Sequence, residues 1–365
     1  MIEVTDLSLR YGDTTVVDRL SVTVKRGEVL VLLGQSGCGK TSAMRCIAGL
    51  EEPTGGSIGI DGRFVFDAAT GTNVPPHKRN IGMVFQSYAI WPHRTVFENV
   101  AFAPKAKGLP ADQVRKRAQE ALQLVGLEHL ASRGASQLSG GQMQRVALAR
   151  SIAMQPQVLL LDEPLSNLDA RLRERLRVEL RAIQQRLGMT WVYVTHDQAE
   201  AFALADSVAV MEKGRIVQLG SPAEIYDRPV SASVAEFVGV ANVLPCTVEE
   251  GGDGVVTARV QGTALRVQGI SHGAQGPRMH ACIRAEDITL APAAQANPDA
   301  PNQWTGRVAV VAFQGGTVTY QVAAQDGPLI HLVRPRRELA FALGDAVCLS
   351  VAPEQVAMVP PGNDA

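Results

Sequence analysis

The sequence predicts an α/β protein with a parallel sheet wrapped by helices, followed by a small all-β domain. Up to about residue 240, short apolar runs alternate with segments of helical period, the usual pattern of repeated strand and helix units. Several of these runs are continuously apolar, as strands buried on both faces should be. Beyond residue 240 the segments alternate in period two and are separated by Gly and Pro, which indicates an antiparallel barrel or sandwich.

The length and composition suit a globular protein of more than one domain. A chain of 365 residues predicts two or three domains, and 46% hydrophobic with 19% charged residues disfavours disorder and coiled coil. The 35 Lys and Arg against 36 Asp and Glu give a net charge of −1, so no global field attracts nucleic acid or anionic lipid. We therefore expect domains at residues 1–240 and 241–365, and no nucleic-acid partner.

The individual elements follow from periodicity. Apolar runs far shorter than the roughly 20 residues that cross a bilayer predict strands and no membrane span, and the first residues lack the features of a secretory signal. Five cysteines without a Cys-x-x-Cys spacing predict free thiols. The expected elements are strands at 29–33, 158–161 and 191–194, helices at 110–125 and 172–187, and C-terminal strands at 278–284 and 347–351.

A glycine-rich segment follows the first of these strands. It runs from Gly34 to Thr41 with the sequence GQSGCGKT, and a plausible helix follows it, which is the context that a P-loop requires. Glycines let successive backbone N–H groups close around phosphate oxygens, and the helix N-terminus adds about half a positive charge. We expect Lys40 to bind terminal phosphates and the Thr41 hydroxyl to bind Mg²⁺. The alternative is a tight turn without a ligand.

Two carboxylates, Asp162 and Glu163, end the buried strand at 158–161. Ligands of open α/β sheets bind at the carboxyl ends of the strands. Asp162 is suited to hold Mg²⁺, directly or through water, and Glu163 to orient and deprotonate an attacking water. This dipeptide is weak evidence alone and gains its weight from following a P-loop.

The segment Leu138-Ser139-Gly140-Gly141-Gln142 distinguishes among the classes of nucleotide-binding protein. Two glycines at the start of a helix, after Ser139, make a second anion site rich in N–H groups, unless they form only a turn. This pentapeptide is the signature of ATP-binding cassette (ABC) proteins, and the chain resembles that family. In the family two cassettes pair head to tail, so the resemblance implies a second copy whose signature closes over the γ-phosphate.

The resemblance extends in order across the N-terminal domain. It implies adenine stacking on Tyr11, sensing of Mg²⁺ and γ-phosphate by Gln86, a dimer-crossing loop that ends at Asp169, and a γ-phosphate contact from His196. For each there is a plain alternative, such as a surface amide at Gln86 or a structural histidine at a strand end. The implied cofactors are ATP and Mg²⁺, with Glu163, His196 and Gln86 catalytic and Thr41, Gln86 and Asp162 at the metal. The implied nucleotide contacts are Tyr11, Gly34, Gln35, Ser36, Gly37, Cys38, Gly39, Lys40, Thr41, Ser42, Ser139, Gly140, Gly141, Gln142 and Asp169.

The resemblance also implies the fold in more detail. The implied fold is a P-loop NTPase (RecA-like) core with an antiparallel β edge and a helical subdomain at about 87–155. A small OB-like (TOBE) domain that serves dimerisation and regulation follows it. Arg284-Ala285-Glu286-Asp287-Ile288 resembles a recurring element of that domain, with Ala285 in place of the usual proline. The apolar segment 87–93 is then expected to dock on a permease, although Arg94 stands where relatives carry an apolar residue, and internal packing of the segment is the alternative.

These features together resemble the ATPase subunits of bacterial binding-protein-dependent importers. The implied partners are a second copy, integral membrane permease subunits and, indirectly, a periplasmic or surface solute-binding protein. The implied location is peripheral, at the cytoplasmic face of the inner membrane. The wording of residues 226–229 and 241–245 is closest to subunits that serve ferric iron, polyamine or phosphonate import. A soluble ABC ATPase of DNA repair or translation and an exporter subunit are the alternatives.

Overall fold

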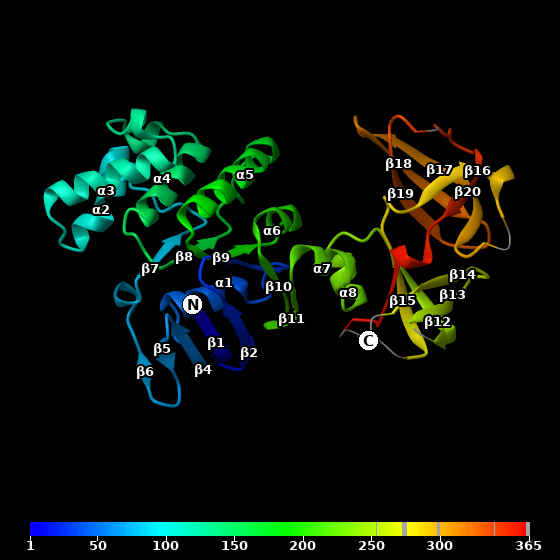
Figure 1. The fold of residues 1–365 in the computed structure, drawn as a ribbon, viewed down its shortest axis with the longest axis horizontal. Coiled ribbons are helices and arrows are strands. Elements are labelled where there is room, and N and C mark those ends of the chain that lie inside the picture. The colour runs from blue at the N-terminus through cyan, green and yellow to red at the C-terminus, as the bar shows by residue number, and fades with distance from the viewer. Residues whose placement is uncertain (253, 272–275, 298–299, 339, 363–365) are drawn as a thin grey trace. The chain divides into compact units, whose positions relative to one another are not determined.

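The computed structural model describes residues 1–252, 254–271, 276–297, 300–338 and 340–362. The chain divides into two compact units, residues 1–222 and 223–365 (Figure 1). The division falls at the start of helix α7 (Pro222–Asp227), ahead of the predicted boundary between residues 240 and 241. Helix α8 (Ala232–Phe237) belongs with the C-terminal unit because its Ala232 and Ala235 pack against Val240, Cys282 and Val359.

The centre of the N-terminal unit is a six-stranded sheet in the order β11-β10-β3-β9-β8-β7. All neighbours pair in parallel except β10 and β11, which are antiparallel. Every residue of strands β3, β8 and β9 is buried, because helices cover both faces of such a sheet. The predicted strands at 29–33, 158–161 and 191–194 are these three. The bounds are β3 Val29–Gly34, β7 Ile81–Val84, β8 Val158–Asp162, β9 Thr190–Thr195, β10 Ser207–Glu212 and β11 Arg215–Gly220.

A second, antiparallel sheet flanks this core in the order β2-β1-β4-β5-β6. Helix α1 (Lys40–Ala48) contributes Met44 and Ile47 to one apolar cluster with residues of both sheets. Burial of that cluster fixes where the residues before α1 lie, since the helix cannot shift without exposing it. The bounds of these strands are β1 Ile2–Tyr11, β2 Thr14–Val24, β4 Gly55–Ile60, β5 Arg63–Asp67 and β6 Thr72–Asn73.

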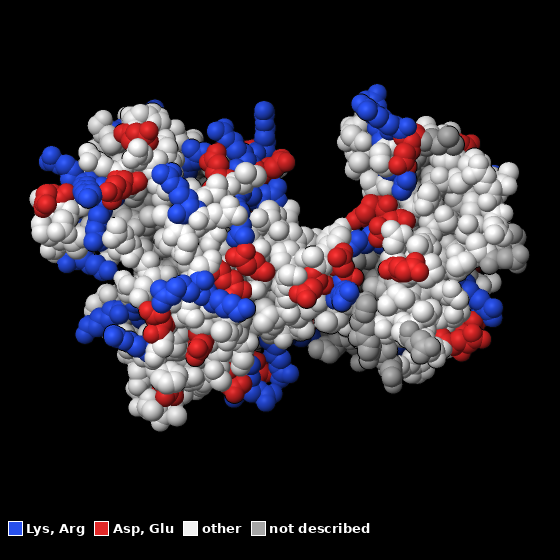
Figure 2. Space-filling model, viewed as in Figure 1, with Lys and Arg blue, Asp and Glu red and all other residues white. Residues whose placement is uncertain are grey.

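Three helices between β7 and β8 form the helical part of this unit. Helix α3 buries Val114, Ala118, Ala121 and Leu122, the apolar side expected from the sequence at 110–125. Helix α5 buries Leu176 and Leu180 and joins β8 to β9, as the periodicity at 172–187 predicted. Figure 2 shows side chains of both charge signs spread over the surface of this unit. The helices of the unit are α2 Val96–Ala106, α3 Ala111–Leu124, α4 Gly140–Ile152, α5 Ala170–Leu187 and α6 Gln198–Leu204, with short 3₁₀ helices at Pro76–Lys78, Glu128–Leu130 and Ala135–Gln137.

The C-terminal unit is built from β-strands, as predicted. Five strands close a barrel, β12-β13-β14-β21-β15, in which only β14 and β21 pair in parallel, and five more form the sheet β16-β20-β17-β18-β19. One apolar cluster, with Trp304 and Tyr320 among its members, holds residues of both. The bounds are β12 Asn242–Gly252, β13 Val255–Val260, β14 Arg266–Ile270, β15 Arg278–Ile283, β16 Thr289–Pro292, β17 Gln303–Phe313, β18 Thr317–Ala324, β19 Leu329–Pro335, β20 Ala346–Ser350 and β21 Val356–Val359, with 3₁₀ helices at Ala293–Gln295 and Pro353–Gln355.

Two expectations about the whole chain also have an outcome. None of the helices in the described ranges combines the length and the hydropathy needed to cross a bilayer. The five cysteines are free, as predicted, and all are buried. Burial raises the pKa of Cys46 and Cys282 to about 12 and that of Cys246 to about 11, so these thiols are protonated and unreactive at neutral pH.

Candidate active site

The glycine-rich loop links β3 to α1 at the carboxyl end of the central sheet. A Cβ on Gly34 would lie 2.4 Å from the carbonyl oxygen of Met211, and one on Gly39 would lie 2.4 Å from that of Val16. Gly39 also has φ 101°, a conformation that L side chains rarely adopt. Glycine is therefore required at both positions, and the backbone passes close enough to its neighbours to form a compact loop.

Lys40 is the first residue of α1 and lies under this loop. It is 4% exposed, and its Nζ donates to the carbonyl oxygens of Gly34 and Gln35 at 2.9 and 2.8 Å. No side chain caps the N-terminus of α1. The first N–H groups of a helix lack partners within the helix, and here they stand beside a buried ammonium group. This arrangement favours an anion such as a nucleotide phosphate.

Thr41 and Asp162 are brought together as the sequence predicted. The Thr41 hydroxyl donates to Asp162 Oδ1 at 2.9 Å. Asp162 is 5% exposed; burial raises its pKa, while the hydrogen bond from Thr41 and the charge of Arg45 oppose this. The described residues include no cluster of three or more His, Cys, Asp or Glu side chains that could hold a metal ion. Because Mg²⁺ commonly uses one or two protein oxygens together with substrate phosphates and water, this oxygen pair fits it.

Glu163 and His196 meet beyond the ends of β8 and β9. His196 Nδ1 lies 3.2 Å from Glu163 Oε1. The backbone N–H of Glu163 donates to the Val194 carbonyl at 3.0 Å, and its φ of 42° is left-handed. Such strain at a non-glycine residue concentrates at functional sites. The carboxylate is thus fixed at the edge of the sheet where ligands of this fold bind, next to a histidine.

Gln86 is tied to the segment that follows Glu163. Its side-chain Nε2 donates to Ser166 Oγ at 3.3 Å, and its backbone carbonyl oxygen accepts from Asn167 Nδ2 at 2.9 Å. The Ser166 hydroxyl donates in turn to the Glu163 carbonyl at 2.9 Å. Asp169 ends this segment and caps α5 by accepting from the N–H of Leu172 at 3.0 Å. The structure therefore brings Gln86, Asp162, Glu163 and His196 to one edge, while the predicted nucleotide contact of Asp169 stays a prediction.

The segment Ser139 to Gln142 starts α4 and is closed on itself. Gln142 N–H donates to Ser139 Oγ at 3.4 Å, and Ser139 N–H donates to Gln142 Oε1 at 3.0 Å, a capping box. Across the described ranges, no hydrogen bond or ion pair joins this segment to residues 34–42. A Cβ on Gly140 would lie 3.1 Å from Leu168 Cδ2, so the segment lies against the loop after Glu163.

Tyr11 ends β1 and is 53% exposed. The neighbouring Glu51 carboxylate raises its pKa. The exposed ring is compatible with base stacking, which stays a prediction.

The segment 87–93 depends on two arginines. Arg150 donates to the carbonyl oxygens of Tyr88 and Ala89 at 2.9 and 2.5 Å, which holds two residues of positive φ. Arg94 lies over the rings of Trp91 and Phe102, at 5.1 and 5.4 Å from the centroids, so a cation–π contact replaces the apolar contact expected there. The role of Arg150 was not predictable from the sequence, because an arginine inside a helical pattern gives no signal of the loop that it binds.

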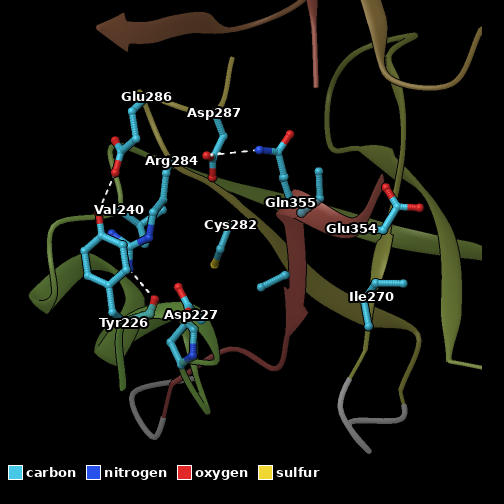
Figure 3. A pocket seen from close by; sticks show the side chains of 13 residues that line it. Tyr226, Asp227, Val240, Ile270, Cys282, Arg284, Glu286, Asp287, Glu354 and Gln355 are labelled. Carbon is cyan, nitrogen blue, oxygen red and sulfur yellow. Dashed lines mark hydrogen bonds between the residues drawn. The ribbon is translucent and has the colours of Figure 1, made fainter. Parts of the chain in front are cut away.

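The C-terminal unit has a cavity of about 380 Å³ that contains none of the predicted catalytic residues (Figure 3). The Arg284 guanidinium lies 3.1 Å from the centroid of the Tyr226 ring and donates to the Tyr226 carbonyl, while the Tyr226 hydroxyl donates to Glu286. Asp287 accepts from Gln355 Nε2 at 3.2 Å. The Arg284 to Ile288 element thus joins α7 to the barrel inside this unit.

Both units of the chain match known protein families. Residues 17–166 match the ABC transporter family and residues 281–359 match the TOBE domain. The first range includes residues 34–42, Gln86, Ser139 to Gln142, Asp162 and Glu163, whereas Tyr11, Asp169 and His196 lie outside it. An Fe(3+) ions import ATP-binding protein, FbpC, of Brucella melitensis biotype 1 is 44% identical over 354 residues, which are 97% of this chain and 96% of that protein. A spermidine/putrescine import ATP-binding protein, PotA, of Legionella pneumophila subsp. pneumophila is 42% identical over 331 residues, 91% of this chain and 89% of that protein.

Solved structures show the same fold. The cbiO1 protein of Clostridium perfringens, part of the ABC transporter complex cbiONQ, has a TM-score of 0.57 at 32% identity over 66% of this chain and 94% of its own. A dimeric ATP-binding cassette in a post-hydrolysis state bound to ADP and Pi has a TM-score of 0.53 at 29% identity over 61% of this chain and 99% of its own. Relatives of this identity, matched over nearly their whole length, show the family. The chain therefore belongs to the ABC transporter family, as an ATP-hydrolysing import ATP-binding subunit with a C-terminal TOBE domain.

Proposed function

We propose that two copies of this chain hydrolyse Mg-ATP at sites shared between them and so power import of a small solute through a membrane permease. The observation that carries the proposal is the pair of contacts at the carboxyl edge of the sheet, Thr41 with Asp162 and Glu163 with His196. These contacts support the proposal because residues suited to phosphate, metal and water then lie side by side, after a loop suited to phosphate.

Phosphoryl transfer requires mostly positioning and charge stabilisation from the protein. Lys40 and the uncapped N–H groups of α1 hold the phosphates, and Thr41, Asp162 and Gln86 are the residues that would hold Mg²⁺. When bound, the metal neutralises charge on the phosphate oxygens. Glu163 accepts a proton from the attacking water, and His196, 3.2 Å from that carboxylate, orients the water and the γ-phosphate.

A second copy completes each site. Ser139 and the following glycines form a donor-rich helix start that has no polar contact with the P-loop in the described parts of the chain. A head-to-tail pair would let this helix start close over the phosphates held by the partner copy. Nucleotide contacts from Tyr11, Gln142 and Asp169 belong to the same proposal, with Asp169 close to the plane between the copies.

The transport partners follow from the relatives. The Brucella protein is named for Fe(3+) ions and the Legionella protein for spermidine and putrescine, so we propose a solute of the ferric iron or polyamine class. The phosphonate class rests only on the sequence of residues 226–229 and 241–245. The chain would bind peripherally at the cytoplasmic face of the cell membrane, with the segment 87–93 against the permease and a solute-binding protein on the opposite side. The C-terminal unit would contribute to pairing and regulation.

Reconstitution in proteoliposomes tests this proposal. The chain is combined with the permease and solute-binding protein encoded beside its gene, and uptake of ferric iron, spermidine and a phosphonate is measured with and without internal ATP. We expect ATP-dependent uptake of one solute, abolished by Glu163→Gln. Copurification of the chain with ribosomes or DNA in place of a permease, with no ATP-driven uptake of any of the three, would contradict the proposal and favour a soluble ABC ATPase.

A further inference from the structure

The loop from Glu163 to Asp169 contacts the start of α4 on one side and the proposed catalytic residues on the other. On one side, a Cβ on Gly140 would come within 3.1 Å of Leu168 Cδ2, and one on Gly141 within 3.0 Å of Leu172 Cδ2. These contacts leave little room for the start of α4 to move without moving Leu168 or Leu172. On the other side, the loop is bound to Gln86 and the Glu163 carbonyl through Ser166.

One side chain connects this loop to the residue next to His196. Arg173 Nη2 donates to the Leu168 carbonyl at 3.1 Å, and Arg173 Nη1 donates to Asp197 Oδ2 at 3.1 Å. Its Nε is buried and has no hydrogen-bond partner among the residues that the structure describes. The side chains of Arg173 and Asp197 are only 28% and 25% exposed, so the ion pair is screened less than a surface pair. A planar guanidinium is suited to bridge two fixed acceptors in this way.

Asp197 transmits this contact to a rigid segment. Its N–H donates to Thr195 Oγ1 at 3.0 Å, and its Oδ1 accepts from the N–H of Glu200 at 3.1 Å. The buried Glu200 carboxylate in turn accepts from Thr195 at 2.8 Å. His196 therefore lies between two residues that are anchored on both sides, and the remaining oxygen of Asp197 faces Arg173.

Other arginines of α5 do not make this bridge. The helix has six arginines, at 171, 173, 175, 177, 181 and 186. Arg175 pairs with Glu179 and Arg181 with Asp206, and Arg171 is exposed with no hydrogen bond or ion pair to another described residue. Arg173 is thus distinguished by its contacts and not by the general charge of the helix.

We propose that Arg173 is a positioning residue that makes the placement of His196 depend on the position of Leu168 and, through it, of the start of α4. The inference rests on the proposed function, in which the start of α4 contacts the phosphates held by the other copy. Arg173 then couples the two ATP sites of the pair. Closure of one copy's α4 start over the phosphates at one site favours the productive placement of the same copy's His196 at the other site.

The matched variants are Arg173→Ala and Arg171→Ala, two residues apart on the same helix. We expect Arg173→Ala to lower kcat for ATP about 10-fold, within the range of coupling energies between linked sites, and to leave the KM for ATP within about twofold. Cooperativity in ATP should fall toward a Hill coefficient of one. Arg173→Lys should restore only part of the rate, because an ammonium group cannot reproduce the planar two-acceptor geometry.

A second measurement does not depend on turnover. With ¹³C-labelled histidine, the His196 resonance is assigned by its loss in His196→Gln, and its shift is followed in Arg173→Ala, Arg171→Ala and Asp197→Asn. The Asn substitution keeps the oxygen that caps α6 and removes the charge that pairs with Arg173. We expect the same shift in Arg173→Ala and Asp197→Asn, no further shift when the two are combined, and none in Arg171→Ala.

The outcomes separate this inference from the function on which it rests. Absence of ATP hydrolysis in the wild-type complex would overturn the proposed function. Wild-type hydrolysis with equal kcat, equal cooperativity and an equal His196 resonance in Arg173→Ala and Arg171→Ala would overturn the role of Arg173 alone. A parallel rise in KM and loss of thermal stability in Arg173→Ala, with the resonance unchanged, would make the residue merely structural and would also overturn it.

Discussion

Two helices of the N-terminal unit have glycine at or just before their first residue and yet differ in how their N-termini are capped. Helix α1 starts at Lys40 after Gly39, with no side-chain cap. Helix α4 starts at Gly140 after Ser139, and Ser139 and Gln142 form a capping box. Both ends are suited to an anion in principle, but α1 lacks a side-chain cap and has the buried Lys40 as its first residue.

This difference predicts different roles for the N-termini of α1 and α4. The α1 end has no side-chain cap, so we expect it to bind a ligand that satisfies its donors. At the α4 end the capping box satisfies the N–H groups of Ser139 and Gln142 without a ligand, so we expect the remaining N–H groups to contact phosphate only when another copy presents one. A single chain should therefore bind nucleotide through α1 and hydrolyse it only as a pair.

Removal of the general base gives the largest expected effect and separates binding from chemistry. Glu163→Gln should lower ATP turnover by about two to four orders of magnitude, the usual contribution of general-base catalysis, because the amide cannot accept the proton. ATP affinity should persist, since Glu163 belongs to neither helix end. Phosphate release and fluorescent-nucleotide titration measure the two quantities. Near-normal hydrolysis would show that Glu163 is not the general base. The two helix ends could then not be assigned to a reaction at this carboxylate.

Lys40→Ala tests the α1 end. The loss of hydrogen bonds to charged phosphates costs about 1.5–3 kcal/mol, so the Kd for ATP should rise roughly 10- to 100-fold. Lys40 is buried and donates to Gly34 and Gln35, so Lys40→Met is the control for lost packing. If titration calorimetry shows wild-type affinity in both variants, the α1 end is not the binding site.

Much of this fold was predictable because its signals are local. Continuous apolar runs are enough to identify β3, β8 and β9, and the period of α5 gives Leu176 and Leu180 as buried. The glycine-rich loop was equally readable, since Gly34 and Gly39 meet backbone atoms that exclude any Cβ. A backbone position that excludes a Cβ can be recognised in the sequence because it requires glycine.

The rest depends on contacts between distant segments. The bridge from Arg173 to both Leu168 and Asp197, the hold of Arg150 on Tyr88, and the contact of Arg94 with two rings each join an arginine to positions that no periodicity connects. The boundary between the units depends likewise on α8 packing against Cys282. The helical pattern placed α8 before the predicted boundary at 240, and its packing assigns it to the C-terminal unit instead.

Ser139→Ala tests the α4 end with a smaller expected effect. It should lower kcat about 10-fold, the lower end of the about 1.5–3 kcal/mol that a hydrogen bond to a charged group contributes, while ATP affinity of the isolated chain stays unchanged. Thr95→Ala is the matched control, because Thr95 and Glu98 form a capping box on α2 away from the nucleotide, and each change should cost about 1 kcal/mol of stability.

Mixing variants sharpens the same test. A pair of one Lys40→Ala chain and one Ser139→Ala chain has one site with both ends intact and one with both ends altered. Its ATPase rate should exceed that of either variant alone. If the rates of the mixture are only the average of the two separate rates, the sites are not shared between copies.

The smallest expected effect is on the reactivity of Cys38, which lies inside the α1 loop. Burial raises the pKa of its thiol, and the charge of Lys40 opposes this, so labelling should be slow and should speed up as pH rises. In a chain with Cys46, Cys246, Cys282 and Cys348 replaced by Ala, Mg-ATP should slow maleimide labelling several-fold by covering the loop. The same chain with Lys40→Ala should lose this protection at ATP concentrations that protect the parent chain. Equal labelling with and without Mg-ATP in the parent chain would show that phosphates do not occupy the loop. Protection that survives Lys40→Ala unchanged would mean that the nucleotide is held elsewhere, and the contrast between the two helix ends would then have no basis in binding.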